Sequence, residues 1–481
     1  MINEIDTVFG LNMKMLKNVI EYKKNIIKIF VSIFFLFYIY SFLMRSFVSV
    51  DTPFYTLIGR SIVYDHVLPY KYIFDHKPFF NFVLYGIWDA IIPVKTGMFT
   101  VLALCCAFFT ARLGAAIWNV KWFNIFIISV TTGSAFEMLS GNTEVIQTLF
   151  QILILFLLRS PSYLALASAG VLTALAFNVN YLTAICLFFP VMFLLFVQRR
   201  PIRDTIIFSI GVLVGLVLLF SPYWLYDTHS LLEYFKQQKQ FLSGYNQGLK
   251  SRVLTLLKLT FYVMFFLPVI YVWAKNNIFD KRVKSDNIVL GLWFVSALVT
   301  SCLSGHPFNH YFSLWFVPVV IMICEVYKFN AKGFSKIFIP IVGLTLFSTI
   351  DVTINNFVKY RNISRIDYSK MSQITAGAPV LNIRAWEVHY YMANMRNADP
   401  YLFRDHVDIA FGHNAVQRYM QDLLQKPSSI ISVYNGCNNG QIEQPICAYI
   451  QNHYDKVYSV KIVKVSGKIN PYSFDLYKIK P

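Results

Sequence analysis

Charged side chains are scarce in this sequence. Only 14% of its 481 residues are charged, and 25 acidic residues stand against 43 basic ones. An ordinary soluble domain carries about 25% charged residues. The mean hydropathy is +0.51. This composition excludes an ordinary water-soluble globule and predicts an integral membrane protein, with membrane lipids as its main surroundings.

The shortage of acidic residues leaves a formal net charge of +18, with 43 basic residues in all. Such an excess can indicate a nucleic-acid partner. Here the basic residues lie mostly in short segments between apolar stretches, where membrane orientation and anionic lipid headgroups account for them. We therefore expect no nucleic-acid partner.

Two short motifs are also absent. None of the seven cysteines forms a CxxC pair, so the sequence gives no indication of a zinc site. The basic start of the chain leads into an apolar stretch without a small-x-small cleavage pattern, which predicts a retained first span. Cys437 and Cys447 lie close together in the one polar part of the chain, and we expect them to form a disulfide if that part faces an oxidising compartment.

Long apolar stretches make up most of the sequence. A helix needs about 20 mainly apolar residues to cross a hydrocarbon core. Eleven stretches suit this purpose: 26–44, 97–118, 122–139, 143–158, 162–178, 181–197, 205–224, 253–274, 287–303, 310–327 and 336–352. A twelfth stretch, 79–94, is short and carries Asp89 in its middle. A carboxylate at bilayer depth is costly, so we expect an interfacial or re-entrant helix there.

The positions of lysine and arginine predict the orientation. With eleven spans, every basic cluster between spans falls on the cytoplasmic side, as the positive-inside rule requires. Residues 1–25 are then cytoplasmic, and 26–355 form a transmembrane domain whose first outer loop covers 45–96. Polar residues return after about residue 355. Short strands near 429–434 and 460–465 and a helix near 415–424 predict that 356–481 form an extracytoplasmic α/β domain.

The first outer loop is dense in ionisable residues for so apolar a chain. It reads Asp-x-x-x-Tyr-x-x-x-Gly-Arg from Asp51 to Arg60, with Tyr55 inside the motif. A second motif, Asp-His-Lys-Pro, begins at Asp75 and contains Lys77. Carboxylates that can accept a proton, a titratable histidine ring and the fixed positive charge of a lysine are thus gathered at one face of the membrane.

These motifs resemble the GT-C superfamily of integral membrane glycosyltransferases. The resemblance is greatest to the branch with the dolichyl-phosphate-mannose protein mannosyltransferases, the aminoarabinose transferases and the RgtA-like enzymes. It implies that Asp51 is the general base that deprotonates the acceptor hydroxyl, and that Lys77 binds the polyprenyl phosphate of the donor. Phe79 departs from the family pattern, in which a second proline is common.

Further polar residues are predicted to contact the substrates. Asp75 and His76 are two ligands that a divalent metal ion accepts, so this pair is the candidate for a metal site. Glu144 begins an expected span, where it either faces the substrate or simply caps an exposed helix start. The candidate donor-phosphate and substrate-binding residues are Lys77, Arg60, Tyr55, Asp75, His76, Glu144, His306, His310 and Tyr311.

Together these features predict a multi-pass enzyme of the cell inner membrane. It would move a hexosyl or pentosyl group from a polyprenyl-phosphate-linked donor to an envelope acceptor, which is lipopolysaccharide or O-antigen, another glycan, a lipid or a protein. Two alternatives stay open: an O-antigen polymerase or ligase, and a transporter of lipid-linked sugar. The crowding of ionisable residues at one face favours the enzyme, because a transporter places them near the bilayer midplane.

Overall fold

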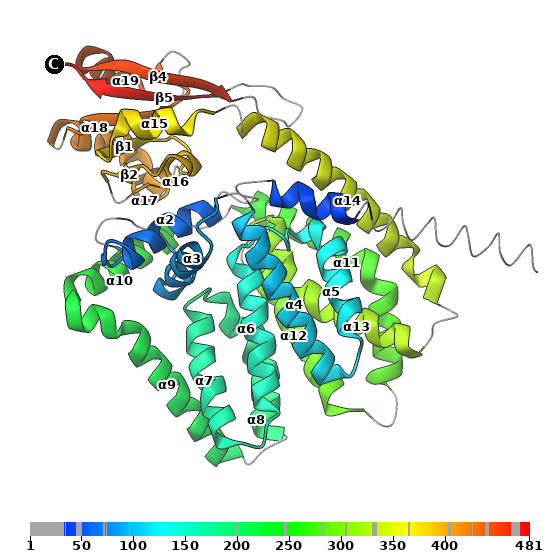
Figure 1. Ribbon diagram of the computed structural model, residues 1–481. Helices are drawn as coiled ribbons and strands as arrows, with labels where there is room; N and C mark the ends of the chain where they lie inside the picture. Colours follow the sequence, from blue (N-terminus) through cyan, green and yellow to red (C-terminus); the bar gives the residue numbers. More distant parts are fainter. Residues whose placement is uncertain are drawn as a thin grey trace, which may run out of the picture.

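The structure, a computed structural model, describes most of the chain. The described residues are 33, 35–44, 51–70, 73, 75–95, 97–197, 201–244, 248–279, 283–303, 305–329, 334–363, 366–399, 401–402, 406–425, 427–437, 442–462 and 472–481. They form a bundle of long helices with a smaller α/β domain on one end (Figure 1). Of the predicted first span, 26–44, the structure describes residues 33 and 35–44, and 35–43 are helical.

The bundle is built from apolar helices. Among the described residues, five helical segments are long and apolar enough to cross a membrane: Met98–Trp118, Pro201–Tyr226, Leu249–Asn277, Ser285–Leu303 and Asn309–Lys328. The bundle elements are α4 (Met98–Trp118), α5 (Trp122–Thr131), η1 (Thr132–Phe136), α6 (Thr143–Leu158), α7 (Tyr163–Phe177), α8 (Leu182–Val197), α9 (Pro201–Tyr226), α11 (Leu249–Asn277), α12 (Ser285–Leu303), η2 (Asn309–Phe312), α13 (Ser313–Phe329) and α14 (Phe334–Ile363).

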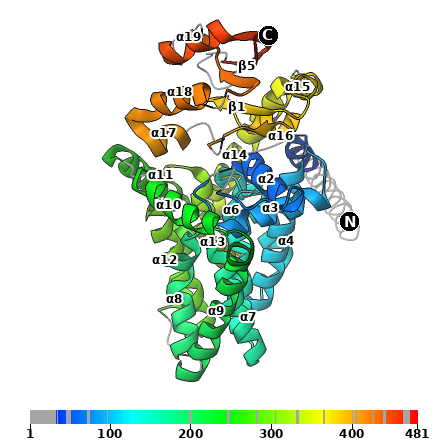
Figure 2. The ribbon, with the colours of Figure 1, turned by 90° about the vertical axis from the view of Figure 1, so that its left-hand side faces the viewer.

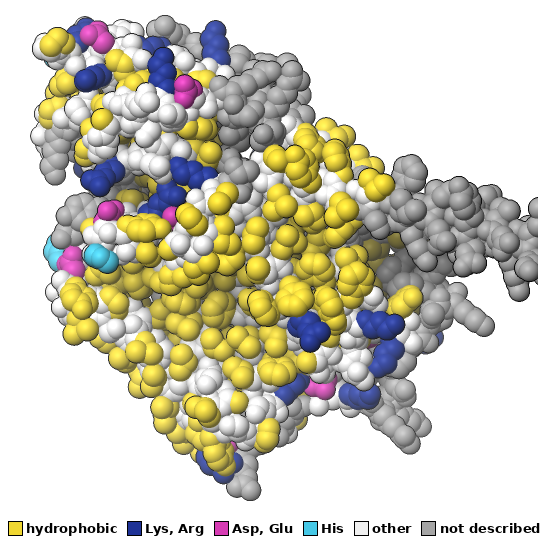
Figure 3. Space-filling view, in the orientation of Figure 1, with side chains coloured by type: hydrophobic (Ala, Val, Ile, Leu, Met, Phe, Trp, Pro, Cys, Tyr) yellow, Lys and Arg dark blue, Asp and Glu magenta, His cyan; other side chains and the backbone are white. Residues whose placement is uncertain are grey.

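The sequence of each helix matches its place in the bundle. α13 is apolar on all sides, and nearly all of its residues from Leu314 to Val326 are buried, as expected of a central helix. α9 exposes residues such as Leu213 and Leu218 instead. Figure 3 shows the result on one face of the molecule: a broad hydrophobic band covers the bundle, with lysine and arginine side chains above and below it. The protein is an integral membrane protein.

One expected span is shorter than its apolar sequence. The stretch 122–139 is helical only to Thr131 in α5 and continues as the 3-10 turn η1, and Glu137 then adopts a positive φ of 56°. The stretch 79–94, where we expect an interfacial or re-entrant helix, forms α3 (Phe79–Ile91), which has 13 residues. A helix of that length rises about 20 Å, too little to cross a hydrocarbon core of about 30 Å.

Three helices lie at the end of the bundle that faces the α/β domain (Figures 1 and 2). They are α2 (Asp51–Val63), α3 and α10 (Thr228–Gly244). α2 and α3 pack with their backbones in direct contact at Gly59 and Gly86, because a Cβ atom at Gly59 would overlap the backbone nitrogen of Gly86. The first predicted loop is thus largely helical, and its two helices form one compact unit.

The C-terminal α/β domain has one five-stranded sheet in the order β2-β1-β3-β5-β4. β1 runs parallel to β2 and β3, whereas β5 is antiparallel to β3 and β4. The expected fold class, a polytopic helical protein with a C-terminal α/β domain, is confirmed. The elements are α15 (Tyr368–Thr375), β1 (Pro379–Ile383), α16 (Val388–Ala393), β2 (Arg396–Asn397), α17 (His406–Phe411), η3 (Gly412–Asn414), α18 (Ala415–Gln425), β3 (Ile430–Tyr434), α19 (Gln444–His453), β4 (Tyr454–Ile462) and β5 (Tyr472–Ile479).

One face of this domain shares its core with the membrane domain. Tyr390, Tyr391 and Phe474 belong to the same buried cluster as the helices of the bundle, and the rings of Tyr391 and Phe99 are 5.9 Å apart. A second cluster, which includes Leu423 and Ile450, belongs to the C-terminal domain alone. The apolar contact fixes the domain over the end of the bundle.

The predicted disulfide between Cys437 and Cys447 is not formed in the structure. Both residues are free thiols. Their side chains nevertheless contact each other, and burial together with this contact raises the pKa of Cys437. The expectation that the fold brings the two side chains together is correct, and the covalent bond is not present.

Candidate functional site

Asp51 is the first residue of α2, where the positive end of the helix dipole favours a carboxylate. Burial raises the pKa of Asp51, while the charges of His310 and Lys77 act in the opposite direction and those of Asp75 and Glu144 add to the rise. The fold therefore brings together predicted residues from four distant parts of the sequence. A carboxylate with a raised pKa is a stronger proton acceptor than one in water.

Lys77 supplies a buried cation beside this carboxylate. Its Nζ lies 3.9 Å from Oε1 of Glu144, and the two side chains are only 10% and 2% exposed. Glu144 sits in the first turn of α6 and also accepts a hydrogen bond from Nδ2 of Asn180 at 3.1 Å. The hydroxyl of Tyr70 donates to the carbonyl oxygen of Lys77 at 2.6 Å. The backbone of Lys77 is thus fixed, and its ammonium is held within an interior pair.

The neighbouring Asp75 and His76 contact each other. Nδ1 of His76 lies 2.8 Å from Oδ1 of Asp75, and Nε2 of Gln238 in α10 donates to the carbonyl oxygen of Asp75 at 3.1 Å. Within the described residues no group of three or more His, Cys, Asp or Glu side chains is placed to hold a metal ion. Asp75 and His76 alone supply two ligand side chains, and these are engaged with each other.

The turn before α13 forms the opposite wall. The rings of His306 and Phe308 stack at 5.1 Å, and those of His310 and Tyr311 lie 4.6 Å apart. Burial, with His76, His310 and Lys77 as further causes, lowers the pKa of His306 to about 4, so this ring is neutral at physiological pH.

Contacts from α11 hold this turn in place. The hydroxyl of Ser251 donates to the carbonyl oxygen of Gly305 at 2.9 Å, and Nζ of Lys258 donates to that of Pro307 at 2.8 Å. These bonds satisfy backbone carbonyls that the turn itself leaves without a helical partner.

Glu137 is a site residue that the sequence reasoning missed. Its Oε2 lies 3.5 Å from Nδ1 of His310. It follows η1, inside a stretch that reads as an uninterrupted span. A glutamate near the end of an apolar stretch was the available signal. Asn180, which binds Glu144, was likewise not foreseen.

Tyr55 lies between the site and the packed helices. Its ring is buried 5.3 Å from that of Tyr85 in α3, and the charges of Asp51, Asp75 and Glu144 raise the pKa of its hydroxyl further than burial alone does. The hydroxyl of Tyr85 donates to the carbonyl oxygen of Gly141 at 2.5 Å. This bond ties α3 to the turn that leads into Glu144.

Gly141 makes that turn possible. It has a φ of 69°, and a Cβ atom there would lie 2.6 Å from the carbonyl oxygen of Phe99. Only glycine meets both requirements without strain.

Arg60 lies apart from the other predicted residues. It is nine residues after Asp51 on the same helix, which places it about 13.5 Å along the axis and on the opposite face. Its guanidinium forms a two-bond ion pair with Asp89, with both distances 2.7 Å. Its Nη1 donates to Oδ1 of Asn394 in the C-terminal domain at 3.0 Å. The structure thus gives Arg60 a role in domain docking.

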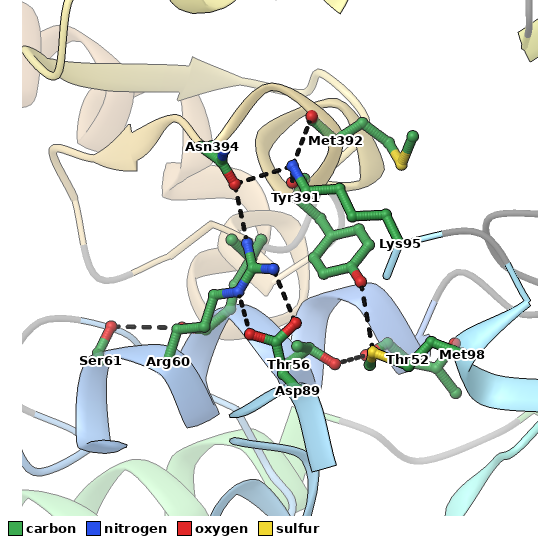
Figure 4. Close-up of polar contacts among 11 residues, drawn as sticks. Thr52, Thr56, Arg60, Ser61, Asp89, Lys95, Met98, Tyr391, Met392 and Asn394 are labelled. Atoms are coloured by element: carbon green, nitrogen blue, oxygen red, sulfur yellow. Dashed lines mark hydrogen bonds and ion pairs between the residues drawn. The ribbon is translucent and has the colours of Figure 1, made fainter. Parts of the chain in front are cut away.

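Lys95 completes this docking cluster (Figure 4). Its Nζ donates to the carbonyl oxygens of Tyr391 and Met392 at 2.8 and 2.7 Å, and to Oδ1 of Asn394 at 2.8 Å. These carbonyls belong to the end of α16, where a cation is favourable. We call Arg60, Asp89, Lys95 and Asn394 the docking cluster.

Comparison with solved structures identifies the fold. ArnT from Cupriavidus metallidurans, an aminoarabinose transferase, matches with a TM-score of 0.58 in its apo state and 0.56 when bound to undecaprenyl phosphate. In both cases identity is 10%, and the match covers 94% of this chain and 98% of ArnT. The oligosaccharyltransferase of Archaeoglobus fulgidus matches with a TM-score of 0.46 at 10% identity, over 91% of this chain and 72% of that one.

The match to ArnT defines the class of fold. No protein-family model and no curated protein matches the sequence. The chain has the GT-C fold, as the resemblance of its first-loop motifs implied. At this level of identity the likeness concerns the fold alone.

Proposed function

We propose that the protein is a membrane glycosyltransferase that moves a sugar from a polyprenyl-phosphate-linked donor to an envelope acceptor. The observation that carries this proposal is the placement of Asp51 at the start of α2, within the electrostatic reach of Lys77, Glu144, Asp75 and His310. A proton acceptor and a buried cation in one site are the two groups that such a transfer requires. That solved ArnT binds undecaprenyl phosphate is consistent with this donor class.

The reaction follows from these two groups. The Asp51 carboxylate takes the proton of an acceptor hydroxyl while the hydroxyl oxygen forms a bond to the anomeric carbon of the donor sugar. The bond between that carbon and the phosphate oxygen breaks, and its electron pair stays on the phosphate. Lys77 neutralises the negative charge that develops there, which is worth most in a poorly hydrated site.

Lys77 is suited to this task by its contact with Glu144. The Nζ–Oε1 separation of 3.9 Å is longer than a direct hydrogen bond. The ammonium is therefore charge-balanced in the absence of donor and still has hydrogen-bonding capacity for a phosphate oxygen. His306 is neutral and adjoins Lys77, so it offers a hydrogen bond without a second fixed charge. Asp75, His76, Tyr55, Glu144, His310 and Tyr311 complete the substrate-binding wall in this proposal.

The experiment is transfer of radiolabelled sugar from purified polyprenyl-phosphate sugars into an envelope fraction. Asp51→Asn keeps the shape and removes the proton acceptor, so turnover should fall at least about 100-fold while donor binding changes little. Lys77→Ala should weaken donor binding as well as turnover, because the cation acts on the phosphate in both the ground and transition states.

Matched controls separate these roles from general damage. Asp351→Asn changes an exposed carboxylate on α14, and Lys250→Ala changes an exposed lysine on α11. Both should transfer sugar at the wild-type rate. If folded Asp51→Asn retains near-normal transfer, Asp51 is not the base and the proposal loses its central residue.

A further inference from the structure

A second cavity lies on the far side of α2 from the site, next to the docking cluster. It has a volume of about 490 Å³ and lies between the C-terminal end of α2 and residues 394–397 and Leu402 of the C-terminal domain. Arg60, Ser61 and Asn394 at its edge are seen in Figure 4. The transfer chemistry proposed above uses none of the residues that line it.

The lining of this cavity has two kinds of surface. Its floor is apolar, made by the buried side chains of Leu57, Ile73, Met395 and Leu402. Its rim carries hydroxyl and amide groups, among them Ser61, Tyr64 and Asn397. A pocket with an apolar floor and a few convergent polar groups is the usual form of a small-ligand site. A sugar ring, with a CH-rich face and hydroxyls around its edge, has the complementary distribution.

Asn397 is the most informative residue of the rim. Both its Nδ2 and its Oδ1 are buried, and neither has a hydrogen-bond partner among the described residues. Leaving a buried polar group unsatisfied costs about 1–3 kcal/mol. A side-chain amide donates through its nitrogen and accepts through its oxygen. Rotated toward the cavity that Asn397 lines, the amide would bond two adjacent sugar hydroxyls and satisfy both atoms at once.

The charges around the cavity select against an anionic ligand. The guanidinium of Arg60 is already paired with Asp89 at 2.7 Å. The two remaining charged residues of the lining, Asp65 and Arg396, have opposite signs. The lining residues together with Asp89 thus have no net charge, and the nearby ammonium of Lys95 is already engaged with three oxygen atoms of the C-terminal domain. A phosphate or an acidic sugar would gain little electrostatic binding free energy here, whereas a neutral saccharide needs none.

A peptide ligand is less well matched. A peptide commonly adds a strand to an exposed sheet edge. The edge strand at this cavity is β2, which has only the two residues Arg396 and Asn397. Two residues give too few backbone hydrogen bonds to hold an extended chain.

The position of the cavity decides which saccharide it would take. Leu57 and Tyr64 follow Asp51 by 6 and 13 residues on or just beyond α2, which corresponds to about 9 and 20 Å along the axis. A ring bound here is too far from Asp51 to be the one that reacts.

We propose that this interdomain cavity is a subsite for a neutral sugar unit of the acceptor, remote from the hydroxyl that is glycosylated. This rests on the proposed function and makes it more specific. The acceptor is then a saccharide chain, which reaches from the cavity to Asp51, and not a single sugar or a protein.

The test measures binding without transfer, so that it does not depend on activity. The probe is the polysaccharide released by mild acid from the envelope of the source organism, added to full-length Asp51→Asn protein in lipid nanodiscs. In this background Asn397→Leu removes the amide, and Ser61→Trp fills the cavity from α2 without altering the C-terminal domain. Each should raise the Kd for the polysaccharide about tenfold, equivalent to the loss of about 1.4 kcal/mol. Asn452→Leu, an exposed change on α19, should leave the Kd unchanged.

Three results would overturn the subsite. The first is an unchanged Kd in both cavity variants, and the second is no binding of the polysaccharide to the protein with an intact cavity. The third tests a polypeptide as the occupant: it is displacement of the polysaccharide by an unfolded protein such as reduced, carboxymethylated α-lactalbumin. Failure of the proposed function is a separate result, because it shows as absence of sugar transfer by the wild-type protein even when the polysaccharide binds.

Discussion

The ammonium of Lys77 lies 3.9 Å from the carboxylate of Glu144, and both side chains are almost fully buried. A buried ion pair gives little net stability, but removal of one partner leaves the other charge without compensation. In the proposed reaction the donor phosphate is a second anion for the same lysine. The pair therefore links the stability of the empty site to the binding of the donor.

Glu144→Gln tests this link. The amide oxygen can still accept the hydrogen bond from Asn180, but the charge that balances Lys77 is lost. We expect the free energy of unfolding to fall by about 3 kcal/mol. Undecaprenyl phosphate should then raise the Tm more in this variant than in the wild type, because it supplies the missing anion. Thermal unfolding with and without this lipid measures both effects, and an equal rise in Tm for the two proteins would contradict the link.

The raised pKa of Asp51 predicts a dependence of activity on pH. A general base acts only when it is ionised, so kcat/KM should fall as the pH drops through a value above the ordinary aspartate pKa of about 3.9. His306, whose pKa is lowered to about 4, should add no step near pH 6.5. A pH profile of transfer checks both statements. An acid limb centred near 6.5 that disappears in His306→Asn would assign the titration to the histidine instead.

The raised pKa of Asp51 also predicts an effect on stability. Activity should fall as the pH drops, whereas the stability contributed by this residue should fall as the pH rises. Because the folded-state pKa of Asp51 exceeds its unfolded value, the folded protein binds more protons there, and stability contributed by this residue is lost as the pH rises through the raised pKa. Asp51→Asn is neutral at every pH. At neutral pH we expect its Tm to equal or exceed that of the wild type while its turnover falls. A marked drop in Tm would indicate a structural role for this carboxylate.

The docking cluster predicts a local change in dynamics. Lys95→Met removes three hydrogen bonds to the end of α16 and to Asn394. We expect faster hydrogen exchange in α16 and in the C-terminal half of α2, with unchanged exchange in α13 at the centre of the bundle. Lys121→Met, an exposed lysine at the start of α5, is the control and should leave all three helices unaffected. Unaltered exchange in α16 would show that the apolar contact alone holds the domain.

The orientation in the membrane is tested by labelling of single cysteines. Gln373→Cys lies in the exposed surface of the C-terminal domain, and Lys284→Cys lies in the segment before α12. With the basic clusters inside, a membrane-impermeant maleimide should label residue 373 in intact cells and reach residue 284 only after permeabilisation. The reverse pattern would place the site on the cytoplasmic face.

The sequence was sufficient for the fold class, and it singled out residues that the fold places close together, whose roles stay predictions. Asp51, Lys77, Glu144 and His310 come from separate segments, and the structure brings them together as the motifs suggested. The length and apolar composition of each stretch carry this information, because spans of alternating direction return every second loop to the same face.

The role of Arg60 could not be predicted from the sequence. In the motif Arg60 follows Asp51 by only nine positions, and the segment reads as a loop. Once residues 51–63 are helical, a spacing of nine places the two side chains on opposite faces. Its contact with Asn394 joins residues 334 positions apart, and no local pattern encodes such a pairing. Glu137 was missed for a related reason, since α5 ends early inside a stretch that is apolar on average.

The backbone contact between Gly59 and Gly86 sets a limit on how related chains can diverge. An alanine at Gly59 would overlap the backbone of α3, and one at Gly86 would overlap that of α2. Because the obstacle on each side is main chain, a smaller side chain elsewhere cannot compensate for either change. The two glycines therefore form a coupled signature that distant relatives with the same α2–α3 packing should share. In alignments too divergent for overall identity to guide the register, this pair marks the positions from which Asp51 and Asp89 can be located.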